Sequence, residues 1–342
     1  MNSEILSIES AALFDEAVGR AAALLRSGQL VALPTETVYG LAANAWDAQA
    51  VRRIYEAKGR PPENPIIVHV AGLEMARRCV STWPALADKL AAAFWPGPLT
   101  LVLPRSPEIP PIVTAGGETV GVRWPSHPFI QAVIRACGFP LAAPSANRAN
   151  ELSPTNPRHV QKSLGEKVPL IIDGGQSQVG IESSVIDLVS SPPRLLRPGM
   201  IHAESLLAAI SEGSLETGAG SSHTLRSPGL LPRHYSPRAR LVVLSWTDEA
   251  HLAASVCAFN LAREKIHVVA HTQIPLREKF GRVAVIPHDA EAYARALYAE
   301  LHQCDEAGAE LIIAEAVPTG GDWSGIADRL ERASHPNISG RR

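Results

Sequence analysis

Long apolar runs are absent from this 342-residue sequence. No stretch of about 18 or more uncharged apolar residues occurs, so no membrane span is predicted. The first residues, MNSEILSIESAALFDEAVGR, carry acidic side chains where a secretory signal has a basic start and an apolar run. We therefore expect a cytoplasmic protein that makes no contact with a membrane.

Paired cysteines are also absent. The four cysteines lie far apart in the chain and form no C-x-x-C pair (Cys79, Cys137, Cys257 and Cys304). Such spacing argues against a zinc site and against a disulfide framework. We expect neutral thiols in a reducing compartment, and we predict no protein metal site.

An excess of basic residues is missing as well. The chain has 32 Lys+Arg against 34 Asp+Glu, and residues 1–211 alone hold 18 of each class. Proteins that bind nucleic acid by counterion release usually show a basic excess. The charge balance therefore gives no support for tight RNA binding. With 46% hydrophobic and 19% charged residues, the composition is that of a soluble globular protein, and the length suggests two domains.

The first part of the sequence alternates apolar strands with helical segments. Neighbouring strands without an intervening helix favour a mixed sheet over a purely parallel one. Thr155 is predicted to be the N-cap of a helix that ends at Leu164. The other predicted helices are Ala11–Arg26, Ala48–Lys58 and His127–Cys137, and the predicted strands are Leu30–Leu33, Ile66–Val70, Leu99–Leu103, Thr119–Arg123, Leu141–Ala143, Leu170–Ile172, Ser184–Val189 and Leu195–Leu196.

Between about Ser211 and Pro237 the periodicity disappears, and Gly, Ser and Pro dominate. We predict a first domain at 1–210, a linker at 211–237 and a second domain at 238–342. Regular alternation in the last part predicts a small, open, mostly parallel α/β sheet of the Rossmann-like kind. Its predicted strands are Leu241–Leu244, His267–Ala270, Val283–Ile286 and Leu311–Val317, and its predicted helices are Asp248–Arg263, Ala290–Ala307 and Ser324–Arg332. No G-x-G-x-x-G follows the first of these strands, so a dinucleotide site there is not expected.

Common catalytic motifs are missing too, including G-x-x-x-x-G-K-[ST], G-x-S-x-G and H-E-x-x-H. Polar clusters instead follow several apolar strands, in loops that a rigid scaffold would position. Each has a plain structural alternative: a Thr-rich turn, a solvated basic turn, or an Arg paired with a structural carboxylate. The clusters are PTETVYGL (34–41), KGRPPENP (58–65), VGVRWP (120–125), AAPSAN (142–147) with SPT (153–155), DGG (173–175), ESS (182–184) and LRPG (196–199).

Taken together, these clusters hold three arginines near strand ends, Arg60, Arg123 and Arg197. They also hold small-residue loops that let a ligand approach the backbone, and they contain no obvious nucleophile–base pair. Arginine binds carboxylates and phosphates through bidentate hydrogen bonds. The pattern indicates a site that binds anions and orients reactants without covalent catalysis.

Eight motifs in a fixed order resemble one family across roughly residues 8–210. They are PTETVYGLAANA, KGRPPENPIIVHV, FWPGPLTLVL, VGVRWPSHP, LAAPSAN, IIDGG, ESSVIDL and LLRPG. This region resembles the YrdC-type catalytic domain of threonylcarbamoyl-AMP synthases. The linker sequence PRHYSP and the following α/β segment resemble the long form of that enzyme.

The resemblance implies a nucleotidyltransferase that makes L-threonylcarbamoyl-AMP and pyrophosphate from L-threonine, bicarbonate and ATP, for the threonylcarbamoyladenosine (t6A) modification of tRNA. It implies Mg²⁺ bound with ATP, downstream threonylcarbamoyl transferase proteins as partners, and at most weak or indirect contact with tRNA. The implied threonine site is Thr37, His69, Arg123, Ala143 and Ser183. The implied ATP site is Lys58, Arg60, Asn64, Thr119, Ser145, Ser153, Arg197, His234 and Tyr235, with Lys58 and Arg60 as catalytic cations.

A regulatory binding protein that keeps the fold without turnover is one alternative, although the intact site residues argue against it. Two other functions stay open on the sequence. An RNA-binding module of the same tRNA-modification pathway is one, although the charge balance argues against it. A related carbamoyl-adenylating domain is the other, but this chain lacks the acylphosphatase-like and zinc-finger segments that accompany such domains.

Overall fold

The computed structural model describes residues 3–210, 214–218 and 235–334. Contacts divide the chain into two compact units, one formed by 1–149 with 153–231 and the other by 150–152 with 232–342. The stretch 150–152 joins the second unit through a parallel bridge between Glu151 and Ser236. In the described part of the chain, no helix is long and apolar enough to cross a membrane.

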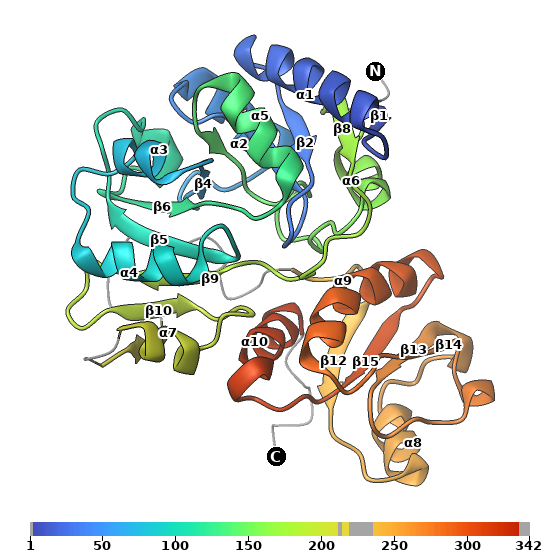
Figure 1. Cartoon of the computed structure of the whole chain (residues 1–342). Helices are drawn as coiled ribbons and strands as arrows, with labels where there is room; N and C mark the ends of the chain where they lie inside the picture. The colour runs from blue at the N-terminus through green and yellow to red at the C-terminus, as the bar shows by residue number, and fades with distance from the viewer. Residues whose placement is uncertain (1–2, 211–213, 219–234, 335–342) are drawn as a thin grey trace. The chain divides into compact units, whose positions relative to one another are not determined.

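The first unit contains an 11-stranded mixed sheet in the order β1-β8-β2-β3-β7-β4-β6-β5-β9-β10-β11 (Figure 1). Parallel pairs such as β4–β6 alternate with antiparallel pairs such as β5–β6. This confirms the prediction of a mixed sheet. The strands are β1 Glu4–Ser7, β2 Val31–Leu33, β3 Gly40–Asn44, β4 Val68–His69, β5 Leu99–Pro104, β6 Thr119–Arg123, β7 Leu141–Ala142, β8 Leu170–Asp173, β9 Ser184–Asp187, β10 Arg194–Arg197 and β11 Glu216–Thr217.

Helices cover this sheet by burying one face each. In Figure 1, α1 and α5 lie side by side, and their apolar residues share one core cluster with β2, β7 and β8. The helices are α1 Ala11–Arg26, α2 Ala48–Lys58, α3 Leu73–Arg78, α4 Ala85–Phe94, α5 Pro128–Cys137, α6 Pro157–Leu164 and α7 Ala203–Ile210, with a 3₁₀ turn, η1, at Pro111–Thr114.

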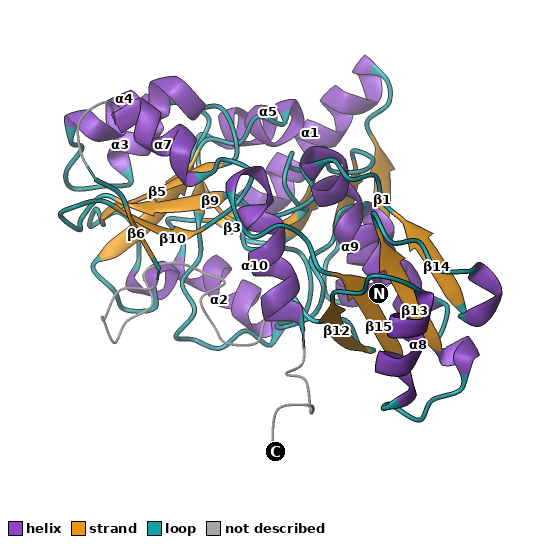
Figure 2. Ribbon diagram, turned by 90° about the horizontal axis from the view of Figure 1, so that it is seen from below, coloured by secondary structure: helices purple, strands orange, loops and turns teal. Residues whose placement is uncertain are grey.

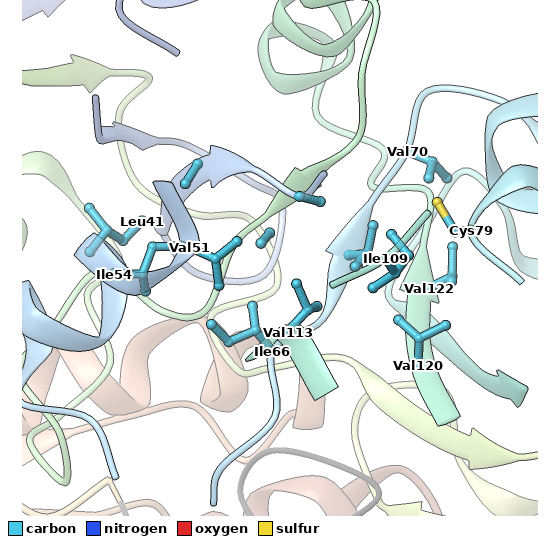
Figure 3. Close-up of a cluster of buried hydrophobic side chains, with 14 of the residues drawn as sticks. Leu41, Val51, Ile54, Ile66, Val70, Cys79, Ile109, Val113, Val120 and Val122 are labelled. Carbon is cyan, nitrogen blue, oxygen red and sulfur yellow. The ribbon is translucent and has the colours of Figure 1, made fainter. Parts of the chain in front are cut away.

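A second apolar cluster draws on β2, β3, β7 and β8 as well, and continues over β4, β5, β6, β9 and β10. Figure 3 shows part of it, with Val120 and Val122 of β6 near Ile109, Val113 and Ile66. Side chains alternate across a strand, so Thr119, Gly121 and Arg123, which precede, separate and follow these valines, face the opposite side of the sheet.

The second unit is a four-stranded, all-parallel sheet in the order β12-β15-β13-β14 (Figure 2). Helix α8 packs against one of its faces, and α9 and α10 contact one another. The predicted open parallel α/β sheet is confirmed. Its elements are β12 Arg240–Leu244, α8 Glu249–Cys257, β13 Ile266–Ala270, β14 Arg282–Val285, α9 Ala290–Glu306, β15 Leu311–Glu315 and α10 Ser324–Ala333, with 3₁₀ turns η2 Arg263–Lys265, η3 Arg277–Lys279 and η4 Gly321–Trp323.

Several predicted helix boundaries are wrong: α5 begins at Pro128 instead of His127, α9 ends at Glu306 instead of Ala307, and α10 ends at Ala333 instead of Arg332. Two others are explained by local geometry. The N-cap of α6 is Asn156, not Thr155, because the Asn156 side chain accepts a hydrogen bond from the backbone N–H of His159 at 3.0 Å. The helix predicted from Asp248 to Arg263 ends at Cys257. Beyond it, Asn260 has a left-handed backbone with φ of 48°, which stops the helix.

Candidate active site

Arg123 ends β6 and is the centre of the predicted threonine site. Its side chain is buried at 4% exposure. Nε donates to the Gly97 carbonyl at 3.2 Å and Nη1 donates to the Thr37 hydroxyl at 2.9 Å. Nη2 lies 2.6 Å from Oε1 of Glu36, which is itself buried. A guanidinium fixed by three neighbours is a pre-oriented partner for an anion.

His69 lies beside Arg123 because β4 and β6 pair in parallel with these two residues in register. Cross-strand partners project from the same face of a sheet. Burial lowers the pKa of His69 well below its ordinary value, and the Arg123 charge adds to that effect. His69 is therefore neutral near pH 7, and its buried Nδ1 has no hydrogen-bond partner among the described residues.

The same edge of the sheet continues to Ser183, just before β9. Its hydroxyl is 2.8 Å from that of Thr100 and accepts a hydrogen bond from Nη2 of Arg197 at 3.1 Å. Nε of Arg197 donates to the Ser183 carbonyl at 3.1 Å. β5 pairs with both β6 and β9, so Thr100 connects the Arg123 region to Ser183. Arg123 and Arg197 thus belong to one polar region.

A second group of predicted residues surrounds the buried Lys58, at the C-terminus of α2. Its Nζ donates to the Ser145 carbonyl at 2.6 Å and also to the carbonyl of Asn147. Arg60 follows after Gly59, whose positive φ of 60° turns the chain. The Arg60 guanidinium donates from Nε to the Asn64 carbonyl at 3.0 Å. Lys58 thus contacts Ser145, whereas Arg60, two residues later in the chain, is held by the Asn64 carbonyl of its own loop.

Segment 34–41 joins the two groups. Thr37 contacts Arg123, while Gly40 bridges Ser145 in an antiparallel pair. A Cβ added to Gly40 would lie 3.3 Å from the Cβ of Ala143, so the absent side chain permits this close approach. Ala143 itself is buried and donates its N–H to the Ile67 carbonyl at 3.1 Å. Segment 34–41 thus links Arg123, through Thr37, with Ser145, through Gly40.

The remaining predicted residues lie at its margins or elsewhere. Ser153 is buried and donates from its hydroxyl to Glu182. Thr119 begins β6, on the same face as Arg123 and roughly 13 Å away at 3.3 Å per residue. His234 lies outside the described residues. Tyr235 belongs to the second unit, where its ring is 6.1 Å from that of Tyr298 and 5.3 Å from the Arg329 guanidinium carbon.

Several polar residues of this region were not singled out in the sequence. Glu36 stands inside the PTETVYGL cluster, and no signal in the sequence placed its carboxylate against Arg123. Thr100 carried no signal, since it stands within an apolar strand. Asn147 and Glu182 also contribute, the first as a partner of Lys58 and the second as the partner of Ser153.

Two families match this chain. One described as Telomere recombination matches residues 23–199, and one described as Threonylcarbamoyl-AMP synthase, C-terminal domain matches residues 201–335. The threonylcarbamoyl-AMP synthase of Pyrococcus abyssi is 40% identical over 319 residues, which are 92% of this chain and 93% of that protein. That of Bacillus subtilis is 40% identical over 330 residues, 94% of this chain and 93% of its own length.

Structural similarity extends over both units. The crystal structure of P. abyssi Sua5 complexed with L-threonine matches with a TM-score of 0.89 and 37% identity, covering 97% of this chain and 98% of that one. Identity at this level over nearly the full length, with both families in order, establishes the relationship. The chain belongs to the threonylcarbamoyl-AMP synthase family.

Proposed function

We propose that this protein joins L-threonine, bicarbonate and ATP into L-threonylcarbamoyl-AMP, releases pyrophosphate, and so supplies the t6A modification of tRNA. The observation that carries the proposal is the connection of two buried cationic groups, one around Arg123 and one around Lys58, through segment 34–41. An amino acid and a nucleotide bound to these groups would meet. The family membership and the threonine complex of the P. abyssi protein support the same function.

On the amino-acid side, Arg123 is proposed to bind the α-carboxylate of threonine. Thr37, His69, Ala143 and Ser183 are proposed to surround the rest of the substrate. The neutral state of His69 suits this role, because a protonated imidazole would repel both Arg123 and the α-ammonium group of threonine. Held in this way, the substrate nitrogen loses its extra proton to solvent and attacks the carbon of bicarbonate; a C–N bond forms, water leaves, and the product is an N-carboxylated threonine.

On the nucleotide side, the phosphates are proposed to bind the cations Lys58, Arg60 and Arg197. The carboxylated threonine attacks the α-phosphorus, and pyrophosphate leaves as these charges stabilise it. The other proposed ATP ligands are Asn64, Thr119, Ser145, Ser153, His234 and Tyr235. The described residues contain no cluster of three or more His, Cys, Asp or Glu that could hold a metal, so Mg²⁺ is proposed to enter as part of the MgATP substrate.

No covalent protein intermediate is part of this proposal. Burial raises the pKa of the Cys79 thiol to about 12 and that of Cys137 to about 11, so neither provides a thiolate at neutral pH. Positioning and charge stabilisation would carry the reaction, which agrees with the absence of a nucleophile–base pair in the sequence.

The direct test is pyrophosphate release from ATP, measured with and without threonine and bicarbonate. The expected result is release that requires both, with L-threonylcarbamoyl-AMP as the product. Release without threonine, or none with all three substrates, would contradict the proposal. Transfer of the product to a downstream threonylcarbamoyl transferase is proposed as the next step, with little or no direct tRNA contact by this chain.

A further inference from the structure

Glu36 is a buried carboxylate with an unusual environment. Neither of its side-chain oxygens has a hydrogen bond among the described residues, although Oε1 is only 2.6 Å from Nη2 of Arg123. The contact is close but poorly directed, and Nη2 of Arg123 is likewise left without a hydrogen bond. Buried polar atoms without partners are rare in native proteins and call for an explanation. Here Glu36, Arg123 and His69 all carry such atoms in one place.

A zwitterionic ligand would satisfy these atoms. If a substrate carboxylate binds Arg123, it competes with Glu36 for the same guanidinium. Glu36 would then remain as an uncompensated buried charge, which is strongly unfavourable unless another cation replaces Arg123. The α-ammonium group of the same ligand is such a cation. One exchange thus keeps the region neutral and gives every charge a partner.

We propose that Glu36 recognises the α-ammonium group of the amino-acid substrate, as Arg123 recognises its carboxylate. This inference rests on the proposed function for the identity of that substrate. After the ammonium group has released a proton to solvent, Glu36 also orients the nitrogen that attacks bicarbonate. It also makes the site selective for an α-amino acid over a simple carboxylic acid.

Neighbouring groups do not offer a better partner for the ammonium. His69 is neutral, because burial and Arg123 lower its pKa; it can accept a hydrogen bond from an ammonium group but has no negative charge to balance it. Glu182 already accepts a hydrogen bond from Ser153. The backbone of Glu36 is fixed, since its carbonyl accepts from the N–H of Val179 at 2.7 Å. Because its backbone is fixed and its side-chain oxygens lack hydrogen bonds, Glu36 can exchange its ion pair with Arg123 for one with an ammonium group without moving its main chain.

The test compares two ligands in calorimetric titrations of the full chain. One is L-threonine and the other is (R)-3-hydroxybutyrate, which has the same carboxylate and hydroxyl but lacks the ammonium. In a Glu36→Gln variant, threonine affinity is expected to fall about 10- to 200-fold, the range for a hydrogen bond to a charged group. Affinity for the deaminated ligand is expected to change little, so the preference for threonine disappears.

Two results would overturn the inference. Equal weakening of both ligands would mean that Glu36 only positions Arg123, and unchanged threonine affinity would mean that Glu36 does not contact the substrate. Glu36→Asp, which keeps the charge, should retain more threonine affinity than Glu36→Gln. Asp187→Asn is the matched control, because it neutralises another buried carboxylate whose side chain accepts from the backbone of Val189, and it should leave the preference intact.

Separate measurements test the role of Glu36 and the proposed function. Threonine-dependent pyrophosphate release by the wild-type protein tests the function. The ratio of the two ligand affinities in wild type and Glu36→Gln tests the role of Glu36, even if no turnover occurs. Thermal melting of each variant shows whether it is folded.

Discussion

Replacing Arg123 by alanine is expected to weaken both the fold and threonine-dependent turnover. The guanidinium is 4% exposed and holds Gly97, Thr37 and Glu36. Removing one partner of a buried ion pair costs about 3–5 kcal/mol, because the other charge stays buried without compensation. At about 1.4 kcal/mol per tenfold change, this corresponds to roughly 10²- to 10⁴-fold. We expect a decrease of that size in kcat/KM for threonine.

A double variant separates the loss of stability from the loss of turnover. Arg123→Ala combined with Glu36→Ala removes both buried charges, so part of the lost free energy of unfolding should return, as measured by urea denaturation. Turnover should not return, since the substrate carboxylate still lacks its partner. The assay is pyrophosphate release at varied threonine and saturating ATP. Wild-type threonine kinetics in Arg123→Ala would refute the reasoning.

Three further predictions address other parts of the molecule. Lys58→Ala should raise the KM for ATP or abolish turnover while calorimetric threonine binding changes little; equal loss of both would contradict separate subsites. Burial lowers the pKa of His69, so the unfolded chain takes up a proton that the folded chain does not as pH falls below about 6.5. The urea midpoint of the wild-type protein should therefore decrease below that pH, and it should decrease less steeply in His69→Asn. Identical pH profiles for the two proteins would show that His69 does not cause the loss of stability. A protein shortened to residues 1–210 should lose pyrophosphate release if the linker contributes ligands, whereas full activity would remove His234 and Tyr235 from the proposed site.

Strong periodicity and capping explain why some elements could be predicted to the residue. Ala11–Arg26 and Ala48–Lys58 each bury one apolar face, and α2 starts at the N-cap Asp47 and ends before the left-handed Gly59. β3 was missed, because GLAAN has small residues with little β-propensity of their own. It is a strand because β2 and β7 pair with it on either side. Such tertiary pairing cannot be obtained from local sequence.

In the candidate site, too, some features could be predicted from local sequence and others depend on tertiary pairing. Arg123 and Arg197 end apolar strands, as the sequence predicted. The same prediction is wrong for Arg60, which follows helix α2 because Gly59 ends that helix. The strand order was not predictable, so the sequence could not show that His69 lies in register with Arg123. Nor could it show that Glu36 lies against the same guanidinium. Partners that are distant in the chain become neighbours only through sheet topology.

Strand β6 makes the stability of the core and the geometry of the site depend on one register. Val120 and Val122 face the apolar cluster of Figure 3, while Gly121 and Arg123 face the polar side. A Cβ on Gly121 would lie 3.1 Å from Thr100 Cγ2, so β5 and β6 can pack this closely at Gly121 because glycine has no side chain. A slip of one residue would exchange the faces and place Arg123 in the core. The apolar packing that stabilises the sheet therefore also fixes where Arg123 presents its charge, and a substrate does not have to supply that ordering when it binds.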